Sequence, residues 1–278
     1  MGRGVDPVLA AFAVQAPSYI AVMVLERIFP HHGDWNRNHA DLGVDLKHIV
    51  TIGLTTGLAD PVLRLFGVVV GSWLLGAYAL QIWPGDWPLA LQLALALVIG
   101  ELGQYWVHRL QHEVPWLWRF HALHHSAPRL YWLNAARFHP FDILINNFAA
   151  IVPLVALGAG EPVLVLWVLF AAIHGIFQHS NVPVRIGPLN WIFSMAELHR
   201  WHHSRLVVES NRNYGQNLIL WDALFGTRFL PADREPPLDI GLTDLPRYPM
   251  TWLAQQLAPF RWSQVVSPTP VAGDDRPS

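Results

Sequence analysis

Long apolar runs are the feature that most restricts the fold of this chain. They cover residues 7–25, 66–82, 89–107, 143–157 and 163–177, and a softer apolar stretch covers 49–58. A helix that crosses a bilayer needs roughly 17–25 predominantly apolar residues. We therefore expect an all-α integral membrane protein with about four to five membrane helices. The last two runs also fit a shallow hairpin, and the first is expected to stay as a helix rather than act as a cleaved signal peptide.

The composition agrees with a membrane location. Only 14% of the residues are charged, whereas soluble domains carry about 25%. The chain has 14 Trp, a residue that favours the bilayer interface. It has no Cys, so any metal would be held by His, Asp or Glu. The net charge of −2 argues against a nucleic-acid partner.

Basic residues are distributed unevenly between the connecting segments. The turns 83–88 and 158–162 contain no Lys or Arg. The other segments contain Arg37, Lys47, Arg64, Arg109, Arg119, Arg129, Arg137, Arg185, Arg200, Arg205, Arg212 and Arg228. Loops rich in Lys and Arg stay on the cytoplasmic side. We expect these segments to share the cytoplasmic face of an inner (cytoplasmic) membrane, with the active site on that face.

The sequence His-x-x-His-His-Ser occurs twice, at His121–Ser126 and at His199–Ser204. His108 and His112 add a pair four residues apart. On a helix, residues three or four apart share a face. We therefore expect a metal cluster, with enough imidazoles for two ions, on a helical cap beside the membrane. Outside these motifs, His31, His32, His39 and His48 are interpreted as structural or surface residues of a polar loop.

Five polar side chains could hydrogen-bond the rings of such ligands, since a ligating imidazole usually donates its second N–H to an acceptor. They are Glu101, Gln104, Asp142, Glu197 and Asp222. Imidazole suits iron, zinc, copper and nickel, so the spacing leaves the metal open.

These motifs resemble the fatty acid hydroxylase / sterol desaturase superfamily of integral-membrane non-haem di-iron oxygenases, in its bacterial sterol desaturase form. The resemblance covers roughly residues 95–230. The histidine motifs match, and Arg137–Asp142, Gln178–Asn181, Asn213–Gly215 and Leu220–Thr227 resemble further segments of that superfamily.

The resemblance implies a lipid hydroxylase or desaturase that uses two Fe ions, O₂ and electrons from a ferredoxin or cytochrome b5-type protein with an NAD(P)H reductase. The substrate would be a sterol, a fatty acyl chain or a related lipid from the bilayer. The implied ligands are His108, His112, His121, His124, His125, His179, His199, His202 and His203. His139, His174, Asn213 and Asp222 are assigned as possible ligands or as residues that support ligands.

Three regions follow from this interpretation: membrane helices in 1–94, a catalytic domain in 95–230, and a tail in 231–278 whose end we expect to be disordered. Two other functions stay open. A zinc-dependent membrane enzyme would need a general base, and the sequence contains no His-Glu-x-x-His. A metal transporter or storage protein would place ionisable residues within the membrane helices, where this chain has few.

Overall fold

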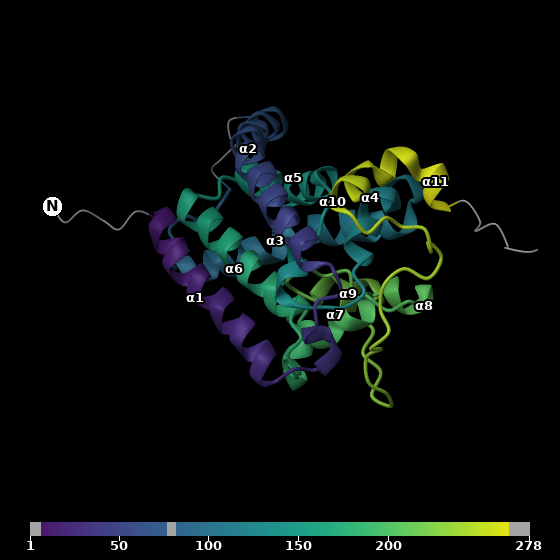
Figure 1. The fold of residues 1–278 in the computed structure, drawn as a ribbon. Helices are drawn as coiled ribbons and strands as arrows, with labels where there is room; N and C mark the ends of the chain where they lie inside the picture. The colour runs from purple at the N-terminus through teal and green to yellow at the C-terminus, as the bar shows by residue number, and fades with distance from the viewer. Residues whose placement is uncertain (1–6, 77–81, 267–278) are drawn as a thin grey trace, which may run out of the picture.

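The computed structural model describes residues 7–76 and 82–266, with the side chains of 7–12 left aside. Six longer helices form the body: α1 Pro7–Ile28, α2 Leu42–Leu75, α3 Leu89–Glu113, α4 Pro115–His125, α5 Pro140–Leu157 and α6 Glu161–His179 (Figure 1). Shorter helices follow: α7 Ala196–His202, α8 Val207–Ser210, α9 Leu220–Phe225, α10 Trp252–Leu257 and α11 Trp262–Val266. The 3-10 segments are η1 Gly33–Asn36, η3 Trp132–Ala136, η4 Gly187–Trp191 and η5 Ala258–Arg261. The described part of the chain has no β-strand and is all-α.

Four helices, α2, α3, α5 and α6, are long and apolar enough to cross a membrane. The two apolar stretches at 49–58 and 66–82, which the sequence analysis separated, belong to one continuous helix up to Leu75, while 77–81 lie outside the described residues. At 34 residues, α2 is about 50 Å long, more than the hydrocarbon core requires. Its outer surface is apolar and exposed, with Leu58 at 78% and Trp73 at 81%. Such a surface needs lipid around it, and the protein is an integral membrane protein.

The spanning helices touch closely where small residues meet. A Cβ added to Gly103 of α3 would lie 2.1 Å from the Ala149 carbonyl oxygen of α5, and one on Gly71 of α2 would lie 2.7 Å from that of Ala156. Small residues allow membrane helices to approach closely and gain van der Waals contact. Helix α5 therefore lies between α2 and α3, with Leu154 and Ile151 in the shared core.

The two turns without Lys or Arg lie together at one end of the bundle. The Trp83 amide donates to the Leu157 carbonyl at 2.9 Å, and Gly158 ends α5 in the left-handed conformation (φ 95°). Arg64 belongs to this end as well, because it pairs with Glu161 at the start of α6. The prediction that Arg64 lies with the basic segments of the histidine end was wrong, because Arg64 is a residue of α2, two thirds of the way along that helix.

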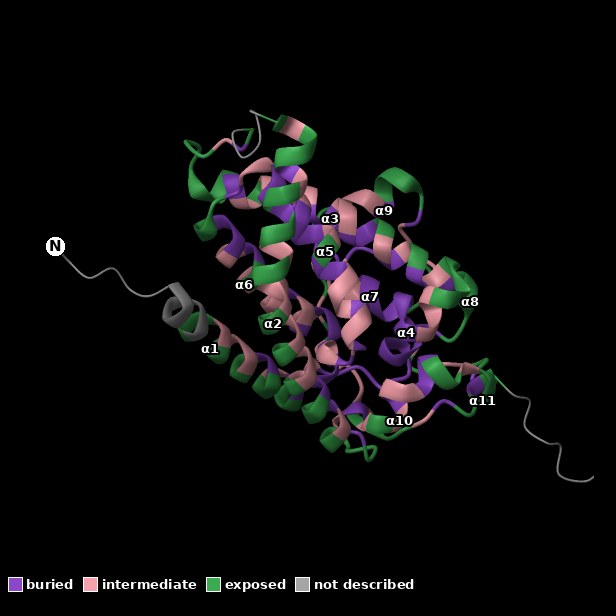
Figure 2. Cartoon of the chain, turned by 90° about the horizontal axis from the view of Figure 1, so that it is seen from above, coloured by how far each residue is buried: buried purple, intermediate pink, exposed green. Residues whose placement is uncertain are grey.

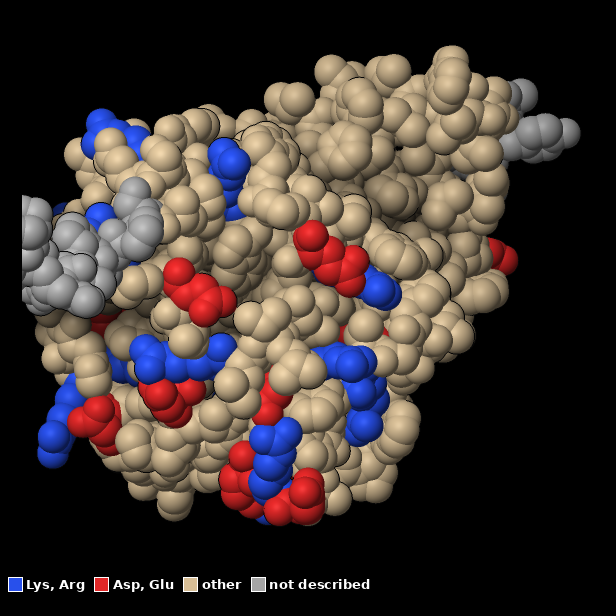
Figure 3. Space-filling view, turned by 90° about the vertical axis from the view of Figure 1, so that its right-hand side faces the viewer, with Lys and Arg blue, Asp and Glu red and all other residues tan. Residues whose placement is uncertain are grey.

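The opposite end carries the cap of short helices. The second half of α4, from Phe120 to His125, is buried there, whereas α2 exposes much of its surface (Figure 2). Charged side chains lie over the left and lower parts of the face in Figure 3, whereas the upper right is almost free of them. Residues 231–266, expected only as a tail, pack onto the cap: Leu245, Ala258 and Val265 bury themselves against Leu123 of α4. The expected disordered end, from Ser267, lies outside the described residues.

Candidate metal centre

The histidines of the cap lie in two adjacent groups, each with its ring nitrogens within 4.8 Å of one another. Group A consists of His108, His112, His121, His125 and His202. Group B consists of His124, His179, His199 and His203. The groups touch, because the rings of His125 and His203 stack with centroids 4.5 Å apart. The structure thus brings together every histidine that the sequence analysis named as an implied ligand.

The two His-x-x-His-His copies divide between the groups in opposite ways. His121 and His125 of the first copy enter group A, and His124 enters group B. In the second copy, His199 and His203 enter group B, and His202 enters group A. Residues four apart lie one above the other on a helix, while their immediate neighbour points to another side. Each copy therefore supplies two rings to one group and one ring to the other.

The rings of group A are held from behind by oxygen atoms of one loop. The Nδ1–H of His108 donates to the Tyr214 carbonyl at 2.6 Å, and that of His202 to the Arg212 carbonyl at 2.8 Å. His112 donates in the same way to Asn211 Oδ1 at 3.1 Å. Because an oxygen acceptor holds the proton on Nδ1, each ring presents an unprotonated Nε2 to the centre of the group.

A carboxylate holds the fourth ring of group A. His121 Nδ1–H donates to Asp142 Oδ2 at 2.9 Å, and both side chains are buried. Gln111 and Asn146 donate to the other oxygen, Asp142 Oδ1, at 2.7 and 2.9 Å. A negative charge behind an imidazole raises its basicity as a ligand.

Asp222 shapes the loop that supports group A. Its carboxylate accepts the amides of Tyr214 and Gly215 at 2.8 and 2.7 Å, and burial raises its pKa to about 6. A Cβ on Gly215 would lie 2.2 Å from the Leu218 carbonyl oxygen, so only glycine fits. Asn213 adopts a left-handed backbone (φ 53°), and its amide donates to the Leu198 and Phe229 carbonyls. Within the described residues, neither Asn213 nor Asp222 hydrogen-bonds a histidine ring; both act on the loop.

Group B is supported from the opposite side, by the segment around η3. His179 Nδ1–H donates to Asn134 Oδ1 at 3.0 Å, and His124 Nδ1–H to the Arg137 carbonyl at 3.3 Å. Arg137 is tied to α2 by a buried ion pair with Asp45 at 2.7 Å, and Arg129 pairs likewise with Asp41. Two buried ion pairs therefore fix the η3 segment, and with it group B, to the first spanning helix.

The geometry of the rings fits bound cations. His108 Nε2 and His121 Nε2 lie 3.1 Å apart although both rings donate from Nδ1, so two lone pairs face each other. The nitrogens His112 Nε2, His125 Nε2 and His202 Nε2 are buried without a partner among the described residues. Burial, and then the neighbouring imidazoles, hold the pKa values of His121, His125 and His203 well below 6.5. Neutral rings with converging lone pairs are what a metal ion requires.

Two histidines named as possible ligands lie outside both groups. His139 caps α5: its Nδ1 accepts the Phe141 amide at 3.0 Å, and its Nε2 lies 3.3 Å from the Gln256 carbonyl. His174 Nε2–H donates to the Ser194 carbonyl at 2.8 Å. His48, assigned from sequence to a polar loop, is instead a buried residue of α2 that contacts Gln255 at 2.9 Å; that assignment was wrong.

The remaining carboxylate and amide candidates have no hydrogen bond to a histidine ring among the described residues. Glu101 accepts from the Gln216 amide and from the Asn217 amide and side chain. Glu197 accepts from Asn190 Nδ2 at 2.7 Å. Gln104 is buried, and its Oε1 has no partner within the described residues. Only Asp142, of the five candidates, lies directly behind a histidine of either group.

Sequence reasoning missed several groups that hold the rings. Asn134 and Asn211 gave no signal, because a lone Asn in a loop is far more often a turn residue. The carbonyls of Arg137, Arg212 and Tyr214 have no sequence signature at all, since every residue carries one. The segment Asn213–Gly215 was singled out, and Asn211, two residues before it, lay within reach of that hint.

Comparison with known proteins identifies this arrangement. The model of the fatty acid hydroxylase family matches residues 93–227, the range that contains groups A and B. Ornithine lipid hydroxylase OlsE of Rhizobium tropici is 40% identical over 259 residues, which cover 92% of this chain and 77% of that protein. The chain belongs to the fatty acid hydroxylase family.

More distant relatives of this chain include two eukaryotic monooxygenases. Alkylglycerol monooxygenase of Danio rerio is 29% identical over 225 residues, covering 78% of this chain and 48% of its own. Methylsterol monooxygenase 2-2 of Arabidopsis thaliana is 28% identical over 142 residues, which cover 50% of this chain and 53% of that protein. The chain spans about half the length of these two relatives. No solved structure matches it significantly. As a member of this family of hydroxylases and monooxygenases, the protein is an oxidoreductase.

Proposed function

We propose that this protein is a membrane-bound oxygenase with one iron ion in group A and one in group B, which inserts oxygen into, or desaturates, a lipid at an unactivated C–H bond. For hydroxylation the balance is R–H + O₂ + 2 electrons + 2 protons giving R–OH + H₂O. The observation that carries the proposal is the pair of adjacent histidine groups whose Nε2 lone pairs converge in a buried site. An all-His donor set suits iron, and the relatives are oxygenases.

When bound, the two metals would supply the redox chemistry with O₂. The protein's own residues would hold and orient them. Asp142 and the loop oxygens of Asn211, Arg212 and Tyr214 keep the protons on Nδ1, so that Nε2 stays free for a metal. Burial of the rings keeps bulk water away, which favours reaction with the lipid over side reactions with solvent.

The substrate and orientation follow from the same features. OlsE is described as an ornithine lipid hydroxylase, and we propose a polar membrane lipid of that kind as the substrate. The histidine end of the bundle would face the cytoplasm across an inner membrane, because Arg37 and Lys47 remain at that end after Arg64 is removed from the count. Electrons would come from a separate one-electron carrier, a ferredoxin or cytochrome b5-type protein served by an NAD(P)H reductase.

Metal analysis and product analysis together test this function. We expect the purified protein in detergent to hold about two iron atoms per chain, and the double variant His124→Ala/His202→Ala to lose them. In cells expressing the wild type under ¹⁸O₂, mass spectrometry should find a membrane lipid that gains one labelled oxygen atom or loses two hydrogens, absent with the double variant. Two zinc atoms in anaerobically iron-supplied protein would replace the proposal with a zinc enzyme. Metal uptake without any oxidised lipid would point to transport or storage.

A further inference from the structure

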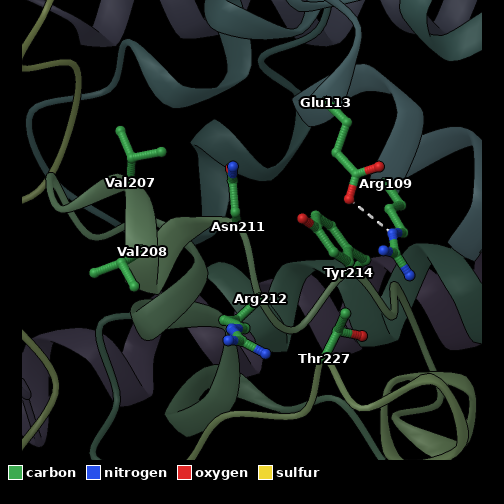
Figure 4. Close-up of a pocket in the computed structure, with 8 residues that line it drawn as sticks. All are labelled: Arg109, Glu113, Val207, Val208, Asn211, Arg212, Tyr214 and Thr227. Atoms are coloured by element: carbon green, nitrogen blue, oxygen red, sulfur yellow. Dashed lines mark hydrogen bonds and ion pairs between the residues drawn. The ribbon is translucent and has the colours of Figure 1, made fainter.

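A surface cavity of about 460 Å³ lies at the wet end of α3, between that helix, α8 and the loop that supports group A (Figure 4). Asn211, Arg212 and Tyr214 form part of its wall. These are the three residues whose oxygens hold His112, His202 and His108 from behind. A single layer of residues therefore separates this cavity from the imidazoles of group A.

The cavity lies on the wrong side of the rings for the reacting lipid carbon. The Nδ1 atoms of His108, His112 and His202 point toward it, and the Nε2 atoms point away into the group. A lipid in the cavity would meet the loop rather than a metal. An electron needs no such access, since it can pass through a hydrogen bond and an imidazole ring. Here one hydrogen bond of 2.6 to 3.1 Å joins each of the three residues in the cavity wall to an imidazole ring of group A.

The rim of this cavity has the character of a protein contact. Leu206, Val207 and Val208 expose 58%, 55% and 72% of their surfaces on α8 and the residue before it. This apolar patch lies far from the exposed surface of α2 in both views of the fold, so lipid around α2 does not cover it (Figures 1 and 2). An apolar centre beside charged residues is typical of an interaction site.

The charge at the rim favours an acidic partner. Arg109 and Arg212 line the cavity together with Glu113, which already pairs with Arg109 at 2.8 Å. Arg212 forms no ion pair within the described part of the chain; its Nη1 donates to the Gly226 carbonyl. One positive charge is thus left without a carboxylate partner in this cavity. Opposite charges across an interface guide encounter and fix orientation.

We propose that this cavity and the adjacent patch Leu206–Val208 are the docking site of the electron donor, a soluble one-electron carrier protein with acidic residues around its redox centre. The proposal rests on the proposed function, because it assumes a redox metal in group A. Two successive dockings would deliver the two electrons of each turnover, and each reduced carrier would leave with one electron fewer. Small, weak interfaces are usual for such encounters.

Opposite charges at one exposed position test this site. Val208→Glu and Val208→Lys both replace an apolar side chain of the patch with a long charged one. They differ in the sign of the charge, and only the glutamate repels an acidic carrier. Iron-loaded protein in detergent would be mixed with a reduced plant-type [2Fe–2S] ferredoxin under O₂, and oxidation of the ferredoxin followed by absorbance. We expect Val208→Glu to raise KM for ferredoxin about fivefold or more and Val208→Lys to lower it, with the difference shrinking at high salt. Arg37→Glu, a charge change at the exposed residue that follows η1, should leave KM unchanged.

Reduced methyl viologen, which needs no protein docking site, separates the two proposals. The activity of each variant with this reductant serves as the reference for its activity with ferredoxin. Equal KM shifts in the two Val208 variants, no shift in either, or a wild type that accepts electrons from viologen but not from ferredoxin would overturn the docking site. A wild type without bound iron, or without O₂ consumption driven by viologen, would instead overturn the proposed function.

Discussion

Groups A and B contain similar rings but differ in what stands behind them. Group A has five histidines, and the loop whose oxygen atoms accept hydrogen bonds from its rings lies against a surface cavity. Group B has four, all buried, and Asn134 and the Arg137 carbonyl support it from a segment that buried ion pairs tie to α2. Group A is held by a loop at the wet surface together with Asp142 of α5, whereas group B is held by the η3 segment, which is tied to the first membrane helix.

This difference in support suggests different roles for the two groups. The loop that supports group A can contact a soluble partner, because it lies outside the spanning helices. The support of group B is sealed: Arg137 and Asp45 are each almost fully buried, and breaking such a pair costs roughly 3–5 kcal/mol. We expect group A to exchange electrons with the surface and group B to depend on the integrity of the bundle.

Removal of one ring from each group should have the largest and most unequal effects. His124→Ala leaves group B with three histidines, while His202→Ala leaves group A with four. We expect each variant to lose the iron of its own group, His124→Ala during purification and with at least about 100-fold of the activity, and His202→Ala more slowly. Metal content and lipid oxidation would be measured on both. His174→Ala, a buried histidine outside the groups, is the control. Equal metal loss from the two group variants would remove the distinction.

Replacement of Asp142 should weaken group A alone. Asp142→Asn removes the negative charge behind His121 and puts an amide N–H near the donors of Gln111 and Asn146. Loss of such a partner typically costs about 10–100-fold in metal affinity. A chelator titration should therefore remove one iron at lower chelator concentration and leave the second unchanged. Asp239→Asn, at an exposed surface carboxylate, provides the matched control. Parallel loss of both irons would show that the groups do not bind independently.

His139 should reveal the smallest effect, and one that is independent of metal. Burial lowers its pKa from 6.5 to about 4 in the folded protein. The unfolded chain therefore takes up a proton as the pH falls below 6.5 while the folded protein does not, so stability is lost as the pH drops toward 4. We expect about 1–2 kcal/mol of this loss between pH 7 and pH 5, after allowance for solvent near the ring. His139→Asn keeps a cap acceptor for α5 and should remove that part of the slope in thermal unfolding. An unchanged slope would mean that His139 does not titrate as described.

Local sequence patterns were enough to predict the membrane helices and the histidines that share a helix face. Apolar runs long enough to span a bilayer can form little except membrane helices, and His at positions three and four apart must share a helix face. The same reasoning failed where a helix runs through a less apolar region. His48 lies in such a region, and it was placed in a loop because its polar neighbours concealed the helix that begins at Leu42.

Contacts between distant segments were beyond the sequence. Arg64 pairs with Glu161, 97 residues away, and this contact alone shows which end of the bundle it belongs to. Asn134 and Asn211 became supports of histidine rings only when η3 and the loop after α8 came to lie behind them. Residues 231–266 gave no pattern beyond Pro and Asp, yet they cover α4.

By itself, the sequence determined an all-α membrane protein with two copies of a histidine motif, because both depend on the spacing of residues along one helix. Only the tertiary structure decided how those histidines are shared. Neighbours His124 and His125 serve different groups, and so do His202 and His203, because two helices face each other across the centre. Which ring belongs to which group depends on the packing of four separate segments, and no single segment of the sequence contains that information.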